Sequence, residues 1–183
     1  MHASDRPLKG GGGGKGARTS ANGSRPMGLR AGLFLAVLVL SLDQVTKLAI
    51  LEWVTPPAAG ITVTGFLAIV LVWNRGMSFG MFNTGDPLVP WILGAIALAV
   101  AVGLVWWLAR ARRPLVILGL GLVLGGAVGN LVDRVLYGAV VDFVLLHAGR
   151  WHWPAFNLAD SAITLGVLAL LWDSLFGAQE SRK

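Results

Sequence analysis

Four long apolar stretches dominate the pattern along this chain. They cover residues 29–51, 87–109, 114–132 and 156–176, and each carries few charges or none. About 20 such residues cross the hydrocarbon of a bilayer as a helix. The pattern therefore predicts four transmembrane helices, and Pro114 suits the first turn of the third.

A fifth uncharged stretch, residues 53–74, predicts a different structure. Its apolar portion Ile61–Trp73 is too short to span a membrane. It follows Pro56 and Pro57, and Ile61–Thr64 alternates apolar and polar residues as a strand does. We expect a small β element on the membrane surface.

The two ends of the chain are polar. Residues 1–28 contain an unbroken run of glycine and several basic residues, which indicates a disordered basic tail. This tail with residues 29–42 imitates a secretory signal, but the apolar run leads into Asp43 and Gln44 instead of a cleavage site. We expect one membrane domain over 29–176 and a short tail over 177–183.

Composition agrees with a membrane protein. The chain has 183 residues, 55% of them hydrophobic, and only 13% charged, whereas a soluble domain has about 25% charged residues. It contains no cysteine, which excludes disulfides, cysteine-bound metals and a thiol nucleophile.

The basic residues predict the topology. The N-terminal tail, the Arg110–Arg113 loop and the C-terminal Arg182 and Lys183 share one side only if there are four spans. Basic loops mark the cytoplasmic side, so we expect both termini there. A basic tail is also compatible with nucleic acid or anionic lipid, but we expect a solvated tail that binds no nucleic acid.

With this topology the polar residues gather at the extracytoplasmic ends of the spans. A protein that moves protons across the membrane should instead place charges at several depths. Ionisable residues in or beside hydrocarbon are costly and are therefore functional candidates. The cluster comprises Asp43, Gln44, Lys47, Asn74, Arg75, Ser78, Asn130, Asp133, Arg134, Asp142 and Asp160.

Some of these residues have structural interpretations. Asp43 and Lys47 are four apart on one helix face and can pair, and Asp133 with Arg134 can form an ion pair that anchors a helix end. Small residues on the third span permit close helix packing; they are Gly119, Gly121, Gly125, Gly126 and Gly129.

Asp142 and Asp160 suggest a catalytic pair. Two carboxyl groups held together share one proton, because both cannot ionise at close range. The ionised group can take a proton from an attacking water, and the protonated group can stabilise the oxyanion. This chemistry hydrolyses a peptide bond without a metal, a cofactor or a nucleophilic side chain.

Other chemistries have weaker support. His147 and His152 lie five apart on a predicted outer loop and could bind a metal, but we expect them to face water or headgroups. Ser161 lacks an evident base, and we expect it to cap the fourth helix.

Five segments in order give the chain a family resemblance. Over Leu33–Trp172 it resembles the lipoprotein signal peptidases (signal peptidase II), which are integral-membrane aspartic peptidases. The matching segments are Asp43–Lys47 (D-Q-x-x-K), Asn74–Phe79 (N-x-G-x-[AS]-F, with Met77 where the family often has Ala), Gly129–Arg134 (G-N-x-x-D-R), Val140–Phe143 and Phe156–Ser161.

The resemblance implies a role for each matching residue. Asp142 and Asp160 match the catalytic aspartates. The residues that match positions organising the site or holding the substrate are Asn74, Gly76, Asn130, Arg134 and Asn157, and those that match supporting positions are Asp43, Lys47 and Asp133.

The resemblance also implies the substrate and the place of action. A bacterial prolipoprotein would be cut just before its diacylglyceryl-modified cysteine, at the outer face of the cytoplasmic (inner) membrane. We expect a monomer surrounded by membrane lipid, with the loop of Trp151 and Trp153 closing over the site.

Two other classes of function remain open from the residues alone. A small proton- or ion-translocating protein would use Asp43, Lys47, Asp133 and Asp142 as a relay. A non-enzymatic membrane scaffold would leave the polar cluster without a purpose.

Overall fold

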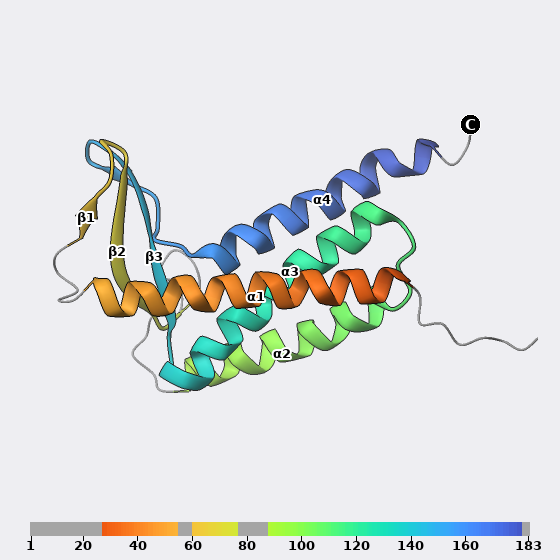
Figure 1. Cartoon of the computed structure of the whole chain (residues 1–183), viewed down its shortest axis with the longest axis horizontal. Helices are drawn as coiled ribbons and strands as arrows, with labels where there is room; N and C mark the ends of the chain where they lie inside the picture. Colours follow the sequence, from red (N-terminus) through yellow and green to blue (C-terminus); the bar gives the residue numbers. More distant parts are fainter. Residues whose placement is uncertain (1–26, 55–59, 77–87, 181–183) are drawn as a thin grey trace, which may run out of the picture.

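In the part of the chain that the structure describes, four helices form a bundle with a small sheet at one end (Figure 1). The structure, a computed structural model, describes residues 27–54, 60–76 and 88–180. Met77 and Ser78 of the sequence analysis lie outside these residues. The helices are α1 (Met27–Trp53), α2 (Val89–Leu108), α3 (Pro114–Tyr137) and α4 (Leu158–Glu180).

All four helices are long and apolar enough to cross a membrane, which confirms the predicted spans. The largest difference is at the end of α3, predicted at residue 132 and found at Tyr137. The polar residues Asn130 and Asp133 are buried against other elements, so α3 continues beyond its uncharged run. It ends at Gly138, whose φ of 66° is the left-handed conformation that glycine adopts without strain.

Helix α3 is the centre of the bundle, with α1, α2 and α4 packed on it. Its glycines make this possible. A β carbon at Gly125 would lie 2.6 Å from the carbonyl oxygen of Ala36 in α1, and one at Gly126 would meet the carbonyl oxygen of Ala159 in α4. The predicted close packing of the small residues on α3 is confirmed.

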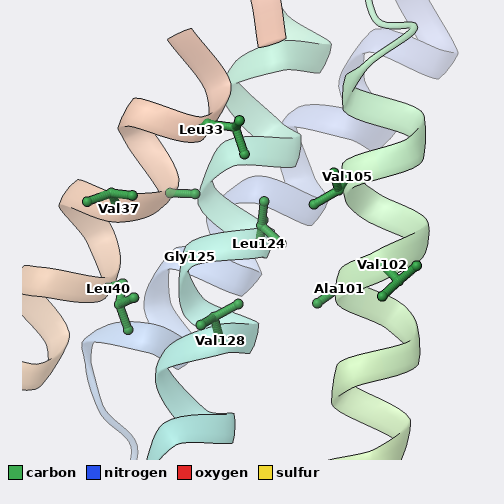
Figure 2. Close-up of a pocket in the computed structure, with 10 residues that line it drawn as sticks. Leu33, Val37, Leu40, Ala101, Val102, Val105, Leu124, Gly125 and Val128 are labelled. Atoms are coloured by element: carbon green, nitrogen blue, oxygen red, sulfur yellow. The ribbon is translucent and has the colours of Figure 1, made fainter. Parts of the chain in front are cut away.

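An apolar groove runs between α1 and α2, over α3 (Figure 2). Its volume is about 390 Å³. Leu33, Val37 and Leu40 of α1 face Ala101, Val102 and Val105 of α2, with Leu124, Gly125 and Val128 of α3 between them. No ionisable side chain lines the groove, so it fits the apolar middle of a bilayer.

The β element is larger than predicted. It is antiparallel, in the order β1-β2-β3-β4, with strands β1 (Ile61–Thr62), β2 (Leu67–Asn74), β3 (Val140–Ala148) and β4 (Trp151–His152). Asp142 lies within β3 opposite Val72 of β2. The predicted outer loop of His147 and His152 is a hairpin in which the two residues face each other across β3 and β4.

An ion pair lies at the opposite end of the bundle from the sheet. Arg113, just before α3, pairs with Asp173 of α4 at 2.8 Å. The prediction that the polar residues collect at one face therefore missed this buried carboxylate. Asp173 is tolerated within the fourth span because Arg113 neutralises it near the helix end.

Candidate active site

The polar side chains meet where α1, α3 and α4 approach the sheet. All ten site residues predicted from the sequence belong to one hydrogen-bonded network at this end of the bundle. They are Asp43, Lys47, Asn74, Gly76, Asn130, Asp133, Arg134, Asp142, Asn157 and Asp160.

Asp160 is placed by the first turn of α4. Asn157 immediately precedes this helix, and its Oδ1 accepts the backbone N–H of Asp160 at 2.9 Å. The Asp160 carboxylate reaches back and accepts the backbone N–H of Asn157 at 3.2 Å. This reciprocal arrangement is a capping box, and it holds the Asp160 side chain in one orientation.

The predicted cap at Ser161 is wrong. The Ser161 hydroxyl donates to the carbonyl oxygen of Asn157 at 3.1 Å and accepts no amide of the first turn. Asn157 takes the capping position because its side chain accepts the orphan N–H three residues ahead. The pattern Asn-x-x-Asp is the sequence signal that would have located this cap.

Asp142 lies beside Asp160 and is held by two amide groups. The Nδ2 of Asn157 donates to one carboxylate oxygen at 2.8 Å, and the Nδ2 of Asn74 donates to the other at 2.9 Å. Pairing of β2 with β3 places Asn74 within reach. Asn157 therefore contacts both aspartates and joins the sheet to α4.

Each of the three asparagine amides is oriented by a second bond. The Oδ1 of Asn74 accepts the backbone N–H of Gly76, that of Asn157 accepts the N–H of Asp160, and that of Asn130 accepts the Lys47 ammonium. With each oxygen occupied, the NH₂ groups point to the aspartates. Asn130 Nδ2 donates to Asp160 at 2.8 Å.

Lys47 is the cationic centre of the supporting residues. Its side chain is 2% exposed, and the Nζ lies 2.7 Å from Asp43, 2.8 Å from Asp133 and 3.0 Å from the Oδ1 of Asn130. The predicted pair of Asp43 and Lys47 is present, although it is part of a larger buried network. A buried ammonium with three such partners is fully hydrogen-bonded.

The predicted ion pair of Asp133 with Arg134 is wrong. Asp133 pairs with Lys47 and accepts the backbone N–H of Val141 at 3.1 Å. Arg134 donates to the carbonyl oxygens of Asn130 and Gly76. Neighbouring residues on a helix point in different directions, so Asp133 faces α1 while Arg134 faces the segment after β2.

Gln44 has a role that the sequence analysis did not assign. Its Nε2 donates to Asp133 at 3.0 Å and lies 3.3 Å from both Asp43 and the carbonyl oxygen of Gly129. It thus ties the two supporting carboxylates together. Its position beside Asp43 in the D-Q-x-x-K segment was the available signal.

The electrostatics of Asp142 suit acid–base chemistry. Burial, and after it the neighbouring Asp160, raise the pKa of its carboxyl group from 3.8 to about 7, against the opposing effects of Asn74, Asn157 and Lys47. Near neutral pH such a pair retains one proton.

A cavity of about 490 Å³ reaches Asp160. Asp160 lies on its wall together with Trp153 and other residues of the hairpin and α4; these are Leu146, Pro154, Ala155, Phe156, Ser161, Thr164 and Leu165. The segment of Trp151 and Trp153, predicted as a loop, is partly strand β4. A carboxylate at the wall of a mostly apolar cavity matches a site for an amphiphilic substrate.

Other centres have little support among the described residues. No group of three or more potential metal ligands occurs there. The buried ionisable side chains lie in the network around Asp142 and Asp160 and in the Arg113–Asp173 pair at the other end of the bundle. The apolar middle of the bundle separates these two groups, so they do not form the relay that proton translocation requires.

The chain is similar to known proteins over most of its length. The family described as signal peptidase (SPase) II matches residues 35–176. The chain is 48% identical to the lipoprotein signal peptidase of Methylobacterium sp. (strain 4-46) over 79% of this chain and 88% of the relative. It is 46% identical to the lipoprotein signal peptidase of Rhodopseudomonas palustris (strain TIE-1), over 82% of this chain and 94% of the relative.

A solved structure also resembles the chain. It is a bacterial membrane enzyme determined by the in meso method at 2.3 Å resolution. The TM-score is 0.71 and the identity 29%, over 84% of this chain and 92% of that one. The likeness therefore extends over the helices and the sheet.

Proposed function

The chain belongs to the signal peptidase II family of membrane aspartic peptidases, which remove signal peptides from prolipoproteins, and we propose that Asp142 and Asp160 are its catalytic dyad. The observation that carries this assignment is their shared set of donors. Asn157 contacts both carboxylates, while Asn74 and Asn130 each contact one. The remaining acids of the network, Asp43 and Asp133, both form an ion pair with Lys47.

The dyad divides the acid and base roles. Asp142 is the more buried and carries the shared proton near neutral pH, for the reasons given above. Asp160 lies on the cavity wall and takes the role of the base in this proposal. Different environments of two carboxyl groups separate their roles in this way.

The reaction then follows from these roles. Asp160 accepts a proton from a water as the water oxygen bonds to the scissile carbonyl carbon. The Asp142 proton hydrogen-bonds the carbonyl oxygen and stabilises its developing negative charge. When the tetrahedral intermediate collapses, the C–N bond breaks, the amine of the lipidated cysteine takes up the proton from Asp160, and the signal peptide leaves with a free carboxyl end.

Arg134 is suited to hold the substrate backbone. Its Nε is a buried donor without a hydrogen-bond partner among the described residues. Its other nitrogens fix the guanidinium through the carbonyl oxygens of Asn130 and Gly76. A carbonyl of the extended substrate would satisfy the free donor, because an unpaired buried N–H is costly.

The substrate enters from the membrane in this proposal. Its signal helix and acyl chains lie in the bilayer and reach the dyad sideways, at the extracytoplasmic ends of the helices. The arginine-rich α2–α3 turn at the other end supports this orientation, in which both termini lie in the cytoplasm. We further propose that the protein acts as a monomer and binds no nucleic acid.

The test is cleavage of a diacylglyceryl-modified prolipoprotein by the purified protein in detergent. Asp142→Asn and Asp160→Asn should each lower the rate by at least about 10³-fold, because each removes one proton-transfer group. Asp173→Asn is the matched control, since it removes a buried carboxylate at the far end of the bundle, and it should cleave at the wild-type rate. Cleavage that persists in either folded dyad variant would overturn the assignment and direct attention to Asp43 or Asp133.

A further inference from the structure

Two arginines at the end of the bundle opposite the dyad carry uncompensated charge. Of the three in the α2–α3 turn, Arg113 is neutralised by Asp173. Arg110 donates to the carbonyl oxygen of Trp106, and its guanidinium lies 4.0 Å from the centre of the Trp106 ring. Arg112 is exposed. Neither Arg110 nor Arg112 forms an ion pair with a carboxylate in the part of the chain that the structure describes.

These two arginines line a hollow that continues as an apolar groove. The hollow has a volume of about 650 Å³ and also contacts Gly28, Ala109, Ala111 and Ile117. The groove, about 520 Å³, follows the facing sides of α1 and α3 and shares Gly28, Arg112 and Ile117 with the hollow. Its remaining lining is Met27, Ala31, Gly32, Leu35, Pro114 and Leu118.

We propose that this hollow and groove bind an anionic phospholipid. The phosphate would lie between Arg110 and Arg112, and one acyl chain would follow the groove along α1 and α3. Basic pockets between transmembrane helices bind anionic headgroups in this way. The charged hollow lies at the helix ends, where the headgroup of a lipid would lie. The apolar groove runs from it toward the middle of the bundle, as an acyl chain would.

The charge of the site argues against its being filled by the N-terminal segment of this chain, which precedes Met27. The chain before Met27 carries Arg6, Lys9, Lys15, Arg18 and Arg25 against the single acid Asp5. A basic segment does not neutralise two arginines, and it adds to the attraction for a negative lipid. The site is also separate from the path of the substrate, because β3 and the start of α4, which carry the dyad, lie at the other end of the bundle (Figure 1).

The experiment compares lipids that differ only in headgroup charge. Native mass spectrometry of the full-length protein in detergent would measure binding of phosphatidylglycerol and of phosphatidylcholine with identical acyl chains. Each arginine near a headgroup contributes about five-fold in affinity, so the two together give a preference of about thirty-fold for phosphatidylglycerol. Arg110→Gln and Arg112→Gln together should abolish this preference.

Arg150→Gln is the matched control, because it removes an exposed arginine from the hairpin turn at the sheet end. It should keep the preference, and all variants should still cleave prolipoprotein, which shows that they are folded. Equal binding of the two lipids by the wild type would overturn the proposal, as would an equal loss in Arg150→Gln. Displacement of the lipid by inorganic phosphate would also overturn it, since the site would then bind an anion and not a lipid.

Discussion

Replacing Lys47 by methionine tests whether the buried network holds the dyad in place. The change keeps a flexible chain of similar length but removes the ammonium that contacts Asp43, Asp133 and Asn130. Two fully buried carboxylates would remain without their cation, and Asn130 would lose the bond that orients its amide toward Asp160.

The size of the effect follows from these contacts. Removing one partner of a buried ion pair costs about 3–5 kcal/mol. For a protein of this size, each kcal/mol lowers the melting temperature by about 2–4 °C. Lys47→Met should therefore melt roughly 6–20 °C below the wild type, and it should cleave more slowly at temperatures where it is still folded.

The assay is thermal unfolding in detergent, followed by tryptophan fluorescence. Val45→Met is the matched control, because Val45 lies on the lipid-facing side of the same helix, and it should melt like the wild type. Adding Asp43→Asn and Asp133→Asn to Lys47→Met should recover part of the loss, since the unpaired charges are then gone. A Lys47→Met protein as stable as the wild type would refute this account of the network.

Two further predictions concern pH and helix packing. The folded protein binds more protons than the unfolded chain between pH 3.8 and about 7, because the pKa of Asp142 is raised over that interval. The stability of the wild type relative to Asp142→Asn should therefore fall as pH rises to about 7 and then level off; melting curves in which this difference does not vary with pH would contradict the prediction. Gly125→Ala brings a β carbon to 2.7 Å from the Cβ of Val39, which should cost about 1–3 kcal/mol in detergent unfolding. Gly103→Ala, with open space around it, should be neutral, and equal effects of the two would argue against the packing explanation.

The membrane spans were predictable because the bilayer restricts them severely. Only a helix satisfies its own backbone in hydrocarbon, and its length must match the thickness. Strand β3 was not predictable in the same way. Its pairing partner β2 lies far earlier in the sequence, and Asp142 faces Val72. Strand register depends on such distant pairing, which local patterns do not reveal.

The sequence predicted which polar residues gather at one end of the bundle, but it did not predict which of them bond to one another. Asp133 stands next to Arg134 in the sequence, yet its cation is Lys47, which comes from another helix. The family resemblance gave the three asparagines an organising role but did not say how they would fill it. The structure shows how, because each amide oxygen is occupied and each NH₂ group faces a carboxylate.

The bond between α1 and α4 has a consequence for biosynthesis. Asp43 accepts the backbone N–H of Ala159, beside the capping box that places Asp160. The ribosome delivers α1 first and α4 last, and domains form from the N-terminal end during synthesis. A nascent chain that lacks α4 has no Asp160, and a completed α4 finds its capping partner only after α1 has been inserted. Since we propose Asp160 as one of the two catalytic carboxylates, we expect proteolytic activity to begin only when the last helix has joined the bundle.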